Sequence, residues 1–265
     1  MMRRARLSAL VLPAWTSIVA VFVLGPLFMV LVVSLTTHDY LSLPDEGLSL
    51  RWYASLLERR DFGAAALRSL WLAAGSSSIA LVLGLAASIA LIRNDLPATR
   101  MLRTLLMTPL FVPMVLSGLA ILSVYSTYGW SDQMSRLFVA HTALTLPYVI
   151  RTLSASLASI DVRQELAARN LGAGPWQTFF RVTLPQLGPG LFAGGLFAFI
   201  VSFDNVGLSL FLAGPGSSTL PVELFSYASF NSDPVVAAVS VTMVVLSIGT
   251  VIVVERLLGL EKLMR

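Results

Sequence analysis

Residues 161–185, DVRQELAARNLGAGPWQTFFRVTLP, hold the clearest structural signals in this sequence. Asp161 and Gln164 occupy the N-cap and N3 positions of a capping box, which predicts a short helix over Val162–Leu171. Gly172 follows at the position where a residue in the left-handed conformation commonly ends a helix. The first half of the stretch is therefore expected to form one short helix that is capped at both ends.

The second half of the stretch predicts another short helix, because Pro175 stands where proline is accepted, at the first helical position. An apolar face at spacings of i, i+3, i+4 and i+7 is formed by Trp176, Phe179, Phe180 and Thr183. Pro185 is expected to force Leu184 out of the helix and to end it sharply. Two short helices joined by a tight turn make a rigid element, and such a loop is expected to dock on a partner.

The segments on both sides of this loop are apolar, and they set the fold class. Hydrophobic residues make up 56% of the 265 residues and charged residues only 12%, about half the charged share of a soluble protein. Six stretches are long enough to cross about 30 Å of hydrocarbon as helices: Ala14–Leu35, Leu67–Ile92, Thr104–Thr127, Leu137–Ser159, Pro189–Ala213 and Val235–Leu257. The sequence predicts an all-α integral membrane protein with six transmembrane helices, the first a retained anchor.

Several classes of function are disfavoured by what the sequence lacks. It has no cysteine, which excludes disulfides and thiolate metal sites, and His38 and His141 form no HExxH pair. Its only lysine is Lys262, so there is no GxxxxGK phosphate loop, and any ATP that drives the protein must bind to another chain. The net charge of +4 is better explained by basic residues between membrane spans than by nucleic-acid binding.

The basic residues predict the orientation in the membrane. With the N-terminus in the cytoplasm, thirteen of the 18 Lys and Arg residues fall on the cytoplasmic side, as the positive-inside rule requires. They are Arg3, Arg4, Arg6, Arg93, Arg100, Arg103, Arg151, Arg163, Arg169, Arg181, Arg256, Lys262 and Arg265. Both termini are therefore expected in the cytoplasm. The outer segments are mildly acidic, which fits a cationic solute, a basic surface on a partner, or simply the exclusion of arginine from that side.

Two spans have small residues at every fourth position, and these stripes are expected to be packing seams, because close backbone approach drives helix association in lipid. The stripes are Ser76, Ala80, Gly84 and Ser88 in one span, and Gly190, Gly194, Ala198 and Ser202 in another. Pro109 and Pro113 in the third span and Pro147 in the fourth are expected to kink or loosen their helices.

The loop resembles the EAA loop of the permeases of binding-protein-dependent ABC importers. ELAARNLG over residues 165–172 and VTLP over residues 182–185 match that motif, although Leu166 occupies the family's glutamate position and Glu165 lies one residue earlier. Whether Glu165 takes the role of that glutamate is left open. The resemblance implies a coupling site for an ATPase subunit, formed by Glu165, Leu166, Ala167, Ala168, Gly172, Ala173, Val182, Leu184 and Pro185.

Further segments are similar to the second, shorter permease of the spermidine/putrescine subgroup. They run from His141 to Val149, from Ser202 to Asn205, from Gly214 to Gly216 and from Thr219 to Val222. The subgroup commonly has glutamate where this chain has Asn205, and charge pairing is one way in which polyamines are recognised. The solute implied is a polyamine or another small cationic organic compound. An aminophosphonate, ferric iron or another small nutrient stays an alternative.

The resemblance also implies the type I ABC importer (MetI-like) permease fold, in a bacterial inner membrane. Expected partners are a different second permease subunit, a periplasmic or lipid-anchored solute-binding protein, and two ATPase subunits that hold ATP and magnesium. This chain is expected to bind no cofactor or metal and to be no enzyme. Its expected parts are residues 1–66 with the first span, the permease core 67–257 with the coupling loop 159–188, and the cytoplasmic tail 258–265.

Candidates for the substrate pathway are Asp204, Asn205, Phe203 and His141. Asp204 lies within the fifth predicted span, which has no basic residue, and an intramembrane carboxylate is costly and hence a functional candidate. A structural hydrogen bond of Asp204 and a packing role of His141 stay open as alternatives.

The predicted outer loop 214–231 holds two candidates for contact with the binding protein, Glu223 and Tyr227. Two other classes of protein are disfavoured. A membrane enzyme would need more acids, bases or metal ligands at membrane depth than Asp204 and His141 supply. A receptor or scaffold would leave the capped, aromatic-faced loop without a purpose.

Overall fold

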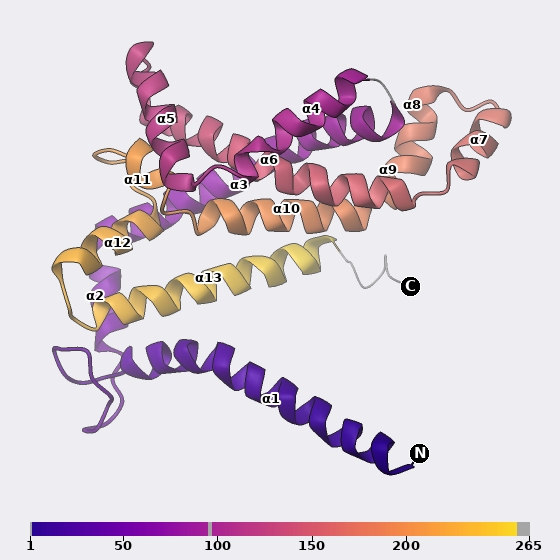
Figure 1. Cartoon of the computed structure of the whole chain (residues 1–265). Helices are drawn as coiled ribbons and strands as arrows, with labels where there is room; N and C mark the ends of the chain where they lie inside the picture. Colours follow the sequence, from indigo (N-terminus) through magenta and orange to yellow (C-terminus); the bar gives the residue numbers. More distant parts are fainter. Residues whose placement is uncertain (1, 95–96, 259–265) are drawn as a thin grey trace. The chain divides into compact units, whose positions relative to one another are not determined.

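The computed structural model describes residues 2–94 and 97–258, and within these ranges every regular element is a helix (Figure 1). Lys262, Arg265 and residues 259–265 of the predicted tail lie outside the described residues. The elements are α1 Met2–Val33, α2 Arg51–Glu58, α3 Arg60–Arg93, α4 Pro97–Met107, η1 Thr108–Leu110, α5 Met114–Thr127, α6 Gln133–Ser159, α7 Val162–Asn170, α8 Pro175–Thr178, η2 Phe179–Thr183, α9 Leu184–Gln186, α10 Gly188–Phe203, α11 Ser209–Leu212, α12 Leu220–Phe230 and α13 Val235–Leu258.

Two compact units divide the chain. The first unit comprises residues 1–63 and 226–247, and the second comprises residues 64–225 and 248–265.

The helices supply up to six membrane spans, as the sequence predicts. Three are long and apolar enough by themselves: Pro13–Val33, Arg60–Arg93 and Val235–Val253. Three further pairs of helices, each bent at a short break, are long and apolar enough if each pair counts as one span. They are Ala98–Leu110 with Met114–Thr127, Gln133–Ser159 with Val162–Asn170, and Pro175–Gln186 with Gly188–Phe203. The fold class is therefore confirmed. The first bend falls at the two prolines where the sequence predicted a kink, and the other two fall at the ends of the predicted coupling loop 159–188.

The third predicted span, Thr104–Thr127, is not one continuous helix. Pro109 lies in the 3₁₀ turn η1, Pro113 is the N-cap of α5, and the two parts meet at 106°. Proline lacks a backbone donor and clashes with the preceding turn, so two prolines four residues apart end one helix and begin another. In the fourth span, by contrast, α6 continues as one helix through Pro147.

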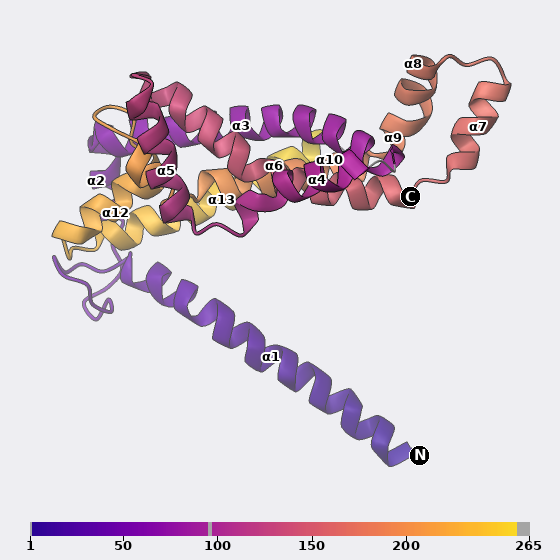
Figure 2. The ribbon, with the colours of Figure 1, turned by 45° about the horizontal axis from the view of Figure 1, so that its top comes forward.

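The core of the second unit forms where α6 packs against α3 and α10 (Figure 1 and Figure 2). All eight residues of the two small-residue stripes are buried. A Cβ atom added at Gly84 of α3 would lie 2.5 Å from Cγ1 of Val149 in α6, and Val149 also lies against Gly194 of α10. The predicted packing seams are confirmed, because glycine lets both helices approach the same residue of α6.

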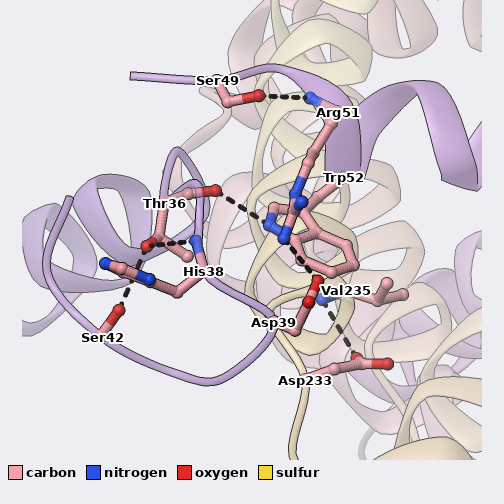
Figure 3. Close-up of polar contacts among 9 residues, drawn as sticks. All are labelled: Thr36, His38, Asp39, Ser42, Ser49, Arg51, Trp52, Asp233 and Val235. Atoms are coloured by element: carbon pink, nitrogen blue, oxygen red, sulfur yellow. Dashed lines mark hydrogen bonds and ion pairs between the residues drawn. The ribbon is translucent and has the colours of Figure 1, made fainter. Parts of the chain in front are cut away.

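In the first unit, polar contacts fold the loop that follows α1 (Figure 3). The indole N–H of Trp52 donates to the carbonyl oxygen of Thr36 at 2.9 Å, and the guanidinium of Arg51 donates to Asp39 at 2.5 Å. Asp233 accepts a hydrogen bond from the backbone N–H of the first residue of α13. This predicted outer segment is therefore ordered, although it lies between apolar helices.

Candidate functional site

The helix α7 begins and ends at the predicted caps. Asp161 accepts a hydrogen bond from the backbone N–H of Arg163 at 2.9 Å, so its side chain caps the second helical position rather than the third. Gly172 has a φ of +93°, as a left-handed C-cap requires. The backbone N–H of Ala173 donates to the carbonyl of Ala168 at 3.0 Å, which completes a Schellman motif. Both ends of α7 are thus fixed by local contacts.

The end of the second short helix was predicted wrongly. Pro185 does not expel Leu184, which has helical angles, and the chain stays helical from α8 through the π-helical turn η2 to the end of α9. A π turn widens the backbone, and we attribute the continuation to this widening, since it accommodates the proline ring within a helix. The bend comes later, with 66° between Pro175–Gln186 and Gly188–Phe203.

Glu165 fastens α7 to the rest of the second unit. Its residue is only 8% exposed, and its Oε1 atom accepts hydrogen bonds from the guanidinium of Arg93 at 2.5 Å and from the hydroxyl of Thr183 at 2.8 Å. Arg93 ends α3 and Thr183 ends η2. One carboxylate therefore joins three elements, and it points inward rather than toward a partner.

A cavity of about 320 Å³ lies behind α7, beside this carboxylate. It is lined by residues of α3, α6, α7, α8 and η2, among them Phe179 and Thr178. The hydroxyl of Thr178 is buried and has no hydrogen-bond partner among the described residues. The contact with Glu165 is therefore the main polar attachment of α7 on this side.

The loop also presents exposed apolar side chains, and one of them, Leu166, borders the cavity as well. Leu166 is 53% exposed and Leu171 is 90% exposed, at the C-cap of α7. The predicted aromatic face divides in two: Trp176 and Phe180 are exposed and stack on each other with ring centroids 6.1 Å apart, whereas Phe179 and Thr183 turn inward. Of the other predicted coupling residues, Ala167 and Pro185 are exposed and Ala168, Ala173, Val182 and Leu184 are half-buried.

His141 is a packing residue in this structure. It is fully buried, with Nδ1 bonded to the hydroxyl of Ser202 at 2.8 Å and Nε2 bonded to that of Ser209 at 2.9 Å. Ser202 in turn lies 3.0 Å from the hydroxyl of Ser76. The imidazole thus ties α6 to α10 and α11, and through Ser76 to α3. This arrangement favours the packing alternative that the sequence left open.

The fifth predicted span, Pro189–Ala213, is too long. α10 ends at Phe203, and Asp204 is its C-cap rather than a residue inside a helix. Asn205 and Gly207 follow within four residues of the helix end. Asn205 is buried, and its side-chain oxygen accepts a hydrogen bond from the backbone N–H of Leu208 at 2.9 Å. This local bond competes with continuation of the helix.

Among the four pathway candidates only Asp204 is exposed. Phe203 is buried and stacks on Phe199, and both side-chain polar groups of Asn205 are engaged, with its amide nitrogen 3.3 Å from the sulfur of Met114. Asp204 is therefore the candidate whose side chain remains exposed in this structure.

The two candidates for binding-protein contact lie on α12 and are both half-buried. The Tyr227 hydroxyl donates to Asp233 at 2.5 Å, and the guanidinium of Arg59 lies 4.9 Å from the Tyr227 ring centroid. Burial, and then the bond to Asp233, raise the pKa of Tyr227. Tyr227 thus has a structural role, and Glu223 has no such contacts among the described residues.

Sequence reasoning missed Arg93 as a site residue. It entered only as one of thirteen cytoplasmic basic residues, because nothing near it in the chain indicates a partner. Its contact with Glu165 spans 72 positions. The position of Glu165, one residue before the family's glutamate position, was the only signal in the sequence, and it did not identify Arg93 as the partner.

Up to six apolar spans, together with a short doubly capped helix between α6 and α8, are features of the permease subunit of a type I ABC importer. The chain belongs to the family of binding-protein-dependent transport system inner membrane components, whose model matches residues 80–258. It is thus an inner membrane component of a transport system.

Relatives and a solved structure support this assignment. The putrescine transport system permease protein PotI of Escherichia coli (strain K12) is 31% identical over 237 residues, which cover 87% of this chain and 84% of that protein. The spermidine/putrescine transport system permease protein PotC of Haemophilus influenzae is 29% identical, over 84% of this chain and 87% of that protein. A bacterial ABC transporter involved in the import of the acidic polysaccharide alginate matches in fold, with a TM-score of 0.69, 19% identity and 97% of both chains covered.

Proposed function

We propose that this permease forms half of the translocation pathway of an importer for polyamines. The names of PotI and PotC support putrescine and spermidine as solutes. The exposed carboxylate of Asp204 supports a cationic solute, because a carboxylate is a strong hydrogen-bond acceptor for an ammonium group. A different second permease subunit completes the pathway in this proposal.

Coupling to ATP hydrolysis takes place at α7, on which an ATPase subunit docks. The observation that supports this most directly is the different burial of two neighbouring side chains: Glu165 is buried against Arg93, whereas Leu166, which also borders the cavity, is largely exposed. The inward carboxylate holds α7 in place, and the exposed apolar side chains supply a contact surface. Each of the two caps contributes on the order of 1 kcal/mol to the stability of α7, and a stable helix resists deformation by a docked subunit.

The orientation follows from the basic residues, with both termini and α7 in the cytoplasm. The two ATPase subunits bind ATP and magnesium on that side, and this chain catalyses no reaction. A solute-binding protein delivers the polyamine at the outer segments, where Glu223 is the candidate contact whose side chain is not engaged in the described residues.

Uptake by the reconstituted importer tests this proposal. The chain is co-purified with its proposed ATPase, second permease and binding-protein partners, and ATP-dependent uptake of putrescine, spermidine, an aminophosphonate and ferric iron is measured in proteoliposomes. Accumulation of a polyamine is expected. Uptake of one of the other solutes without any polyamine would overturn the proposed substrate, and absence of an ATPase from the purified complex would overturn the coupling role.

The same assay tests Asp204. Asp204→Asn removes the charge with little change in shape and is expected to lower polyamine uptake at least tenfold, whereas Asp204→Glu should retain most of it. Assembly of the complex, measured by size-exclusion chromatography, should not change. Equal uptake by Asp204→Asn and the unchanged protein would remove Asp204 from the pathway.

A further inference from the structure

A hollow of about 310 Å³ lies in the second unit, between the C-terminal part of α3, α4 and α6. Two arginine side chains from different helices line it, Arg103 of α4 and Arg151 of α6, together with Ser154. Its other walls are aliphatic or thioether side chains from Leu91, Ile92, Met107, Ile150 and Ala155. Its volume is at the lower end of the range for small-ligand sites.

Neither arginine has an acidic partner among the described residues. The ion pairs formed within residues 2–94 and 97–258 are His38–Asp45, Arg51–Asp39 and Arg93–Glu165. Two positive groups that face one hollow repel each other, so an anion between them would relieve the repulsion and form charge-assisted hydrogen bonds. The hydroxyl of Ser154 adds a neutral donor to the same space.

The position of Arg151 along α6 sets its depth. α6 has 27 residues and is therefore about 40 Å long, roughly 10 Å more than the hydrocarbon core of a bilayer. Arg151 lies eight residues before the end of α6 at Ser159, about 12 Å along the helix axis. A long arginine side chain extends toward the interface, which brings its guanidinium to the level of the cytoplasmic headgroups in the proposed orientation.

We propose that this hollow binds an anionic phospholipid of the cytoplasmic leaflet. The lipid phosphate lies between Arg103 and Arg151, and the beginning of an acyl chain lies along the aliphatic walls. Basic pockets between transmembrane helices on the cytoplasmic side suit such headgroups. A carboxylate from the second permease would satisfy the charges, but it would leave the aliphatic walls without a partner, and the lipid satisfies both.

Bound lipid would add a polar bridge between Arg103 of α4 and Arg151 of α6, two helices that are already in contact. α4 meets α5 at a bend of 106°, so its position is not fixed by a continuous helix. Lipid binding at this hollow depends on the proposed orientation in the membrane, and it is independent of the proposed solute and of the coupling role.

Lipid binding by the full-length chain tests the proposal. The protein is purified in detergent, stripped of lipid, and titrated with phosphatidylglycerol or phosphatidylcholine in mixed micelles, with native mass spectrometry as the readout. Phosphatidylglycerol is expected to bind at least tenfold more tightly than phosphatidylcholine. Inorganic phosphate at the same concentration should not compete, which distinguishes a lipid headgroup from free phosphate.

Substitutions locate the site. Arg103→Gln and Arg151→Gln should each weaken phosphatidylglycerol binding roughly fivefold, and together roughly 25-fold. Arg100→Gln is the matched control, since Arg100 is exposed on α4 and does not line the hollow, and it should change binding less than twofold. If the double glutamine variant does not fold, Arg103→Lys with Arg151→Lys keeps the charges and should retain the preference for phosphatidylglycerol.

Several results would overturn the proposal: equal binding of the two lipids, competition by free phosphate, equal effects of Arg100→Gln and Arg103→Gln, or loss of lipid preference in the lysine variant. Arginine variants that keep the lipid but lose the second permease would assign the hollow to a protein contact instead. Because no transport is measured, failure of polyamine uptake leaves this test unaffected.

Discussion

The carboxylate of Glu165 lies 2.5 Å from the guanidinium of Arg93, and this contact joins the short helix α7 to the end of the long span α3. Thr183 donates to the same carboxylate oxygen at 2.8 Å. A buried carboxylate with two donors resists displacement, because movement away from either donor exposes an unpaired charge to a poorly solvated site. A force applied to α7 is therefore transmitted to α3 through a charged hydrogen bond as well as along the chain.

Glu165→Gln should weaken this attachment while it keeps the shape of the side chain. Loss of the charge is expected to lower the free energy of unfolding by about 1–3 kcal/mol, less than for a fully buried pair because Arg93 is partly exposed to solvent. In the reconstituted importer, the ratio of ATP hydrolysed to solute imported should rise several-fold. Thermal unfolding and paired measurements of ATP hydrolysis and uptake check the two effects.

Arg163→Gln is the control for that experiment, since Arg163 is an exposed basic residue on the same helix. It should leave both stability and the ATP ratio nearly unchanged. If Glu165→Gln behaves as Arg163→Gln does, the inward carboxylate has no part in coupling.

The features that were predictable from the sequence are those fixed by near neighbours in the chain. The Asp161 and Gly172 caps depend on residues within one helical turn, and the stripe around Gly84 depends on a four-residue repeat. Each followed from the sequence and is present in the structure. The inward orientation of Glu165 depends on Arg93, 72 positions away, and no local pattern contains that information.

The wrong predictions have local physical causes too. Pro185 was expected to end a helix, but the π turn η2 precedes it and keeps Leu184 helical. Asp204 was placed inside a span because the apolar residues continue to Ala213, whereas the Asn205 side chain binds the backbone of Leu208 and α10 ends before it. Hydropathy measures apolar length, and it does not detect a helix end formed by one side chain.

Gly172→Val should disorder the end of α7 without any steric clash. Gly172 has a φ of +93°, and an added Cβ would meet no atom within 4 Å, so the cost is backbone strain alone. For an L-residue this strain is about 1–2 kcal/mol. Uptake is expected to fall while ATP hydrolysis continues, and hydrogen exchange of the α7 amides should accelerate.

Gly174→Ala gives the matched comparison two residues further along. Gly174 also has no atom within 4 Å of an added Cβ, but its φ of −68° suits any residue. It should transport at the unchanged rate. Equal loss of coupling in both variants would show that small size at this turn matters, and that the left-handed conformation does not.

Gly84→Ala should destabilise the packing of α3 against α6. The new methyl group would lie 2.5 Å from Cγ1 of Val149, and such overpacking costs about 1–3 kcal/mol. Adding Val149→Ala should recover part of this loss, because it removes the closest atom, and thermal unfolding of the four proteins of the double-mutant cycle measures the coupling. Gly249→Ala, in open space on α13, should be neutral or stabilising by roughly 0.5–1 kcal/mol. Independent effects of the Gly84 and Val149 substitutions would contradict the contact.

The loop after α1 should lose order in acid at a pH set by Asp45. Its carboxylate lies 2.6 Å from Nε2 of His38, and this hydrogen bond lowers the pKa of Asp45 below the ordinary value of 3.8. A carboxyl group with a lowered pKa in the folded state stabilises the fold above its ordinary pKa and ceases to do so as the pH falls through the lowered one.

Hydrogen exchange over residues 36–49, corrected for its intrinsic pH dependence, should therefore show full protection at pH 5 and a decline below pH 4. Asp45→Asn should lack this step and should be less protected at pH 5. Glu46→Gln should follow the unchanged protein, because the Glu46 side chain forms no hydrogen bond or ion pair among the described residues. A decline of the same size in the Asp45→Asn variant would assign the acid sensitivity to another group.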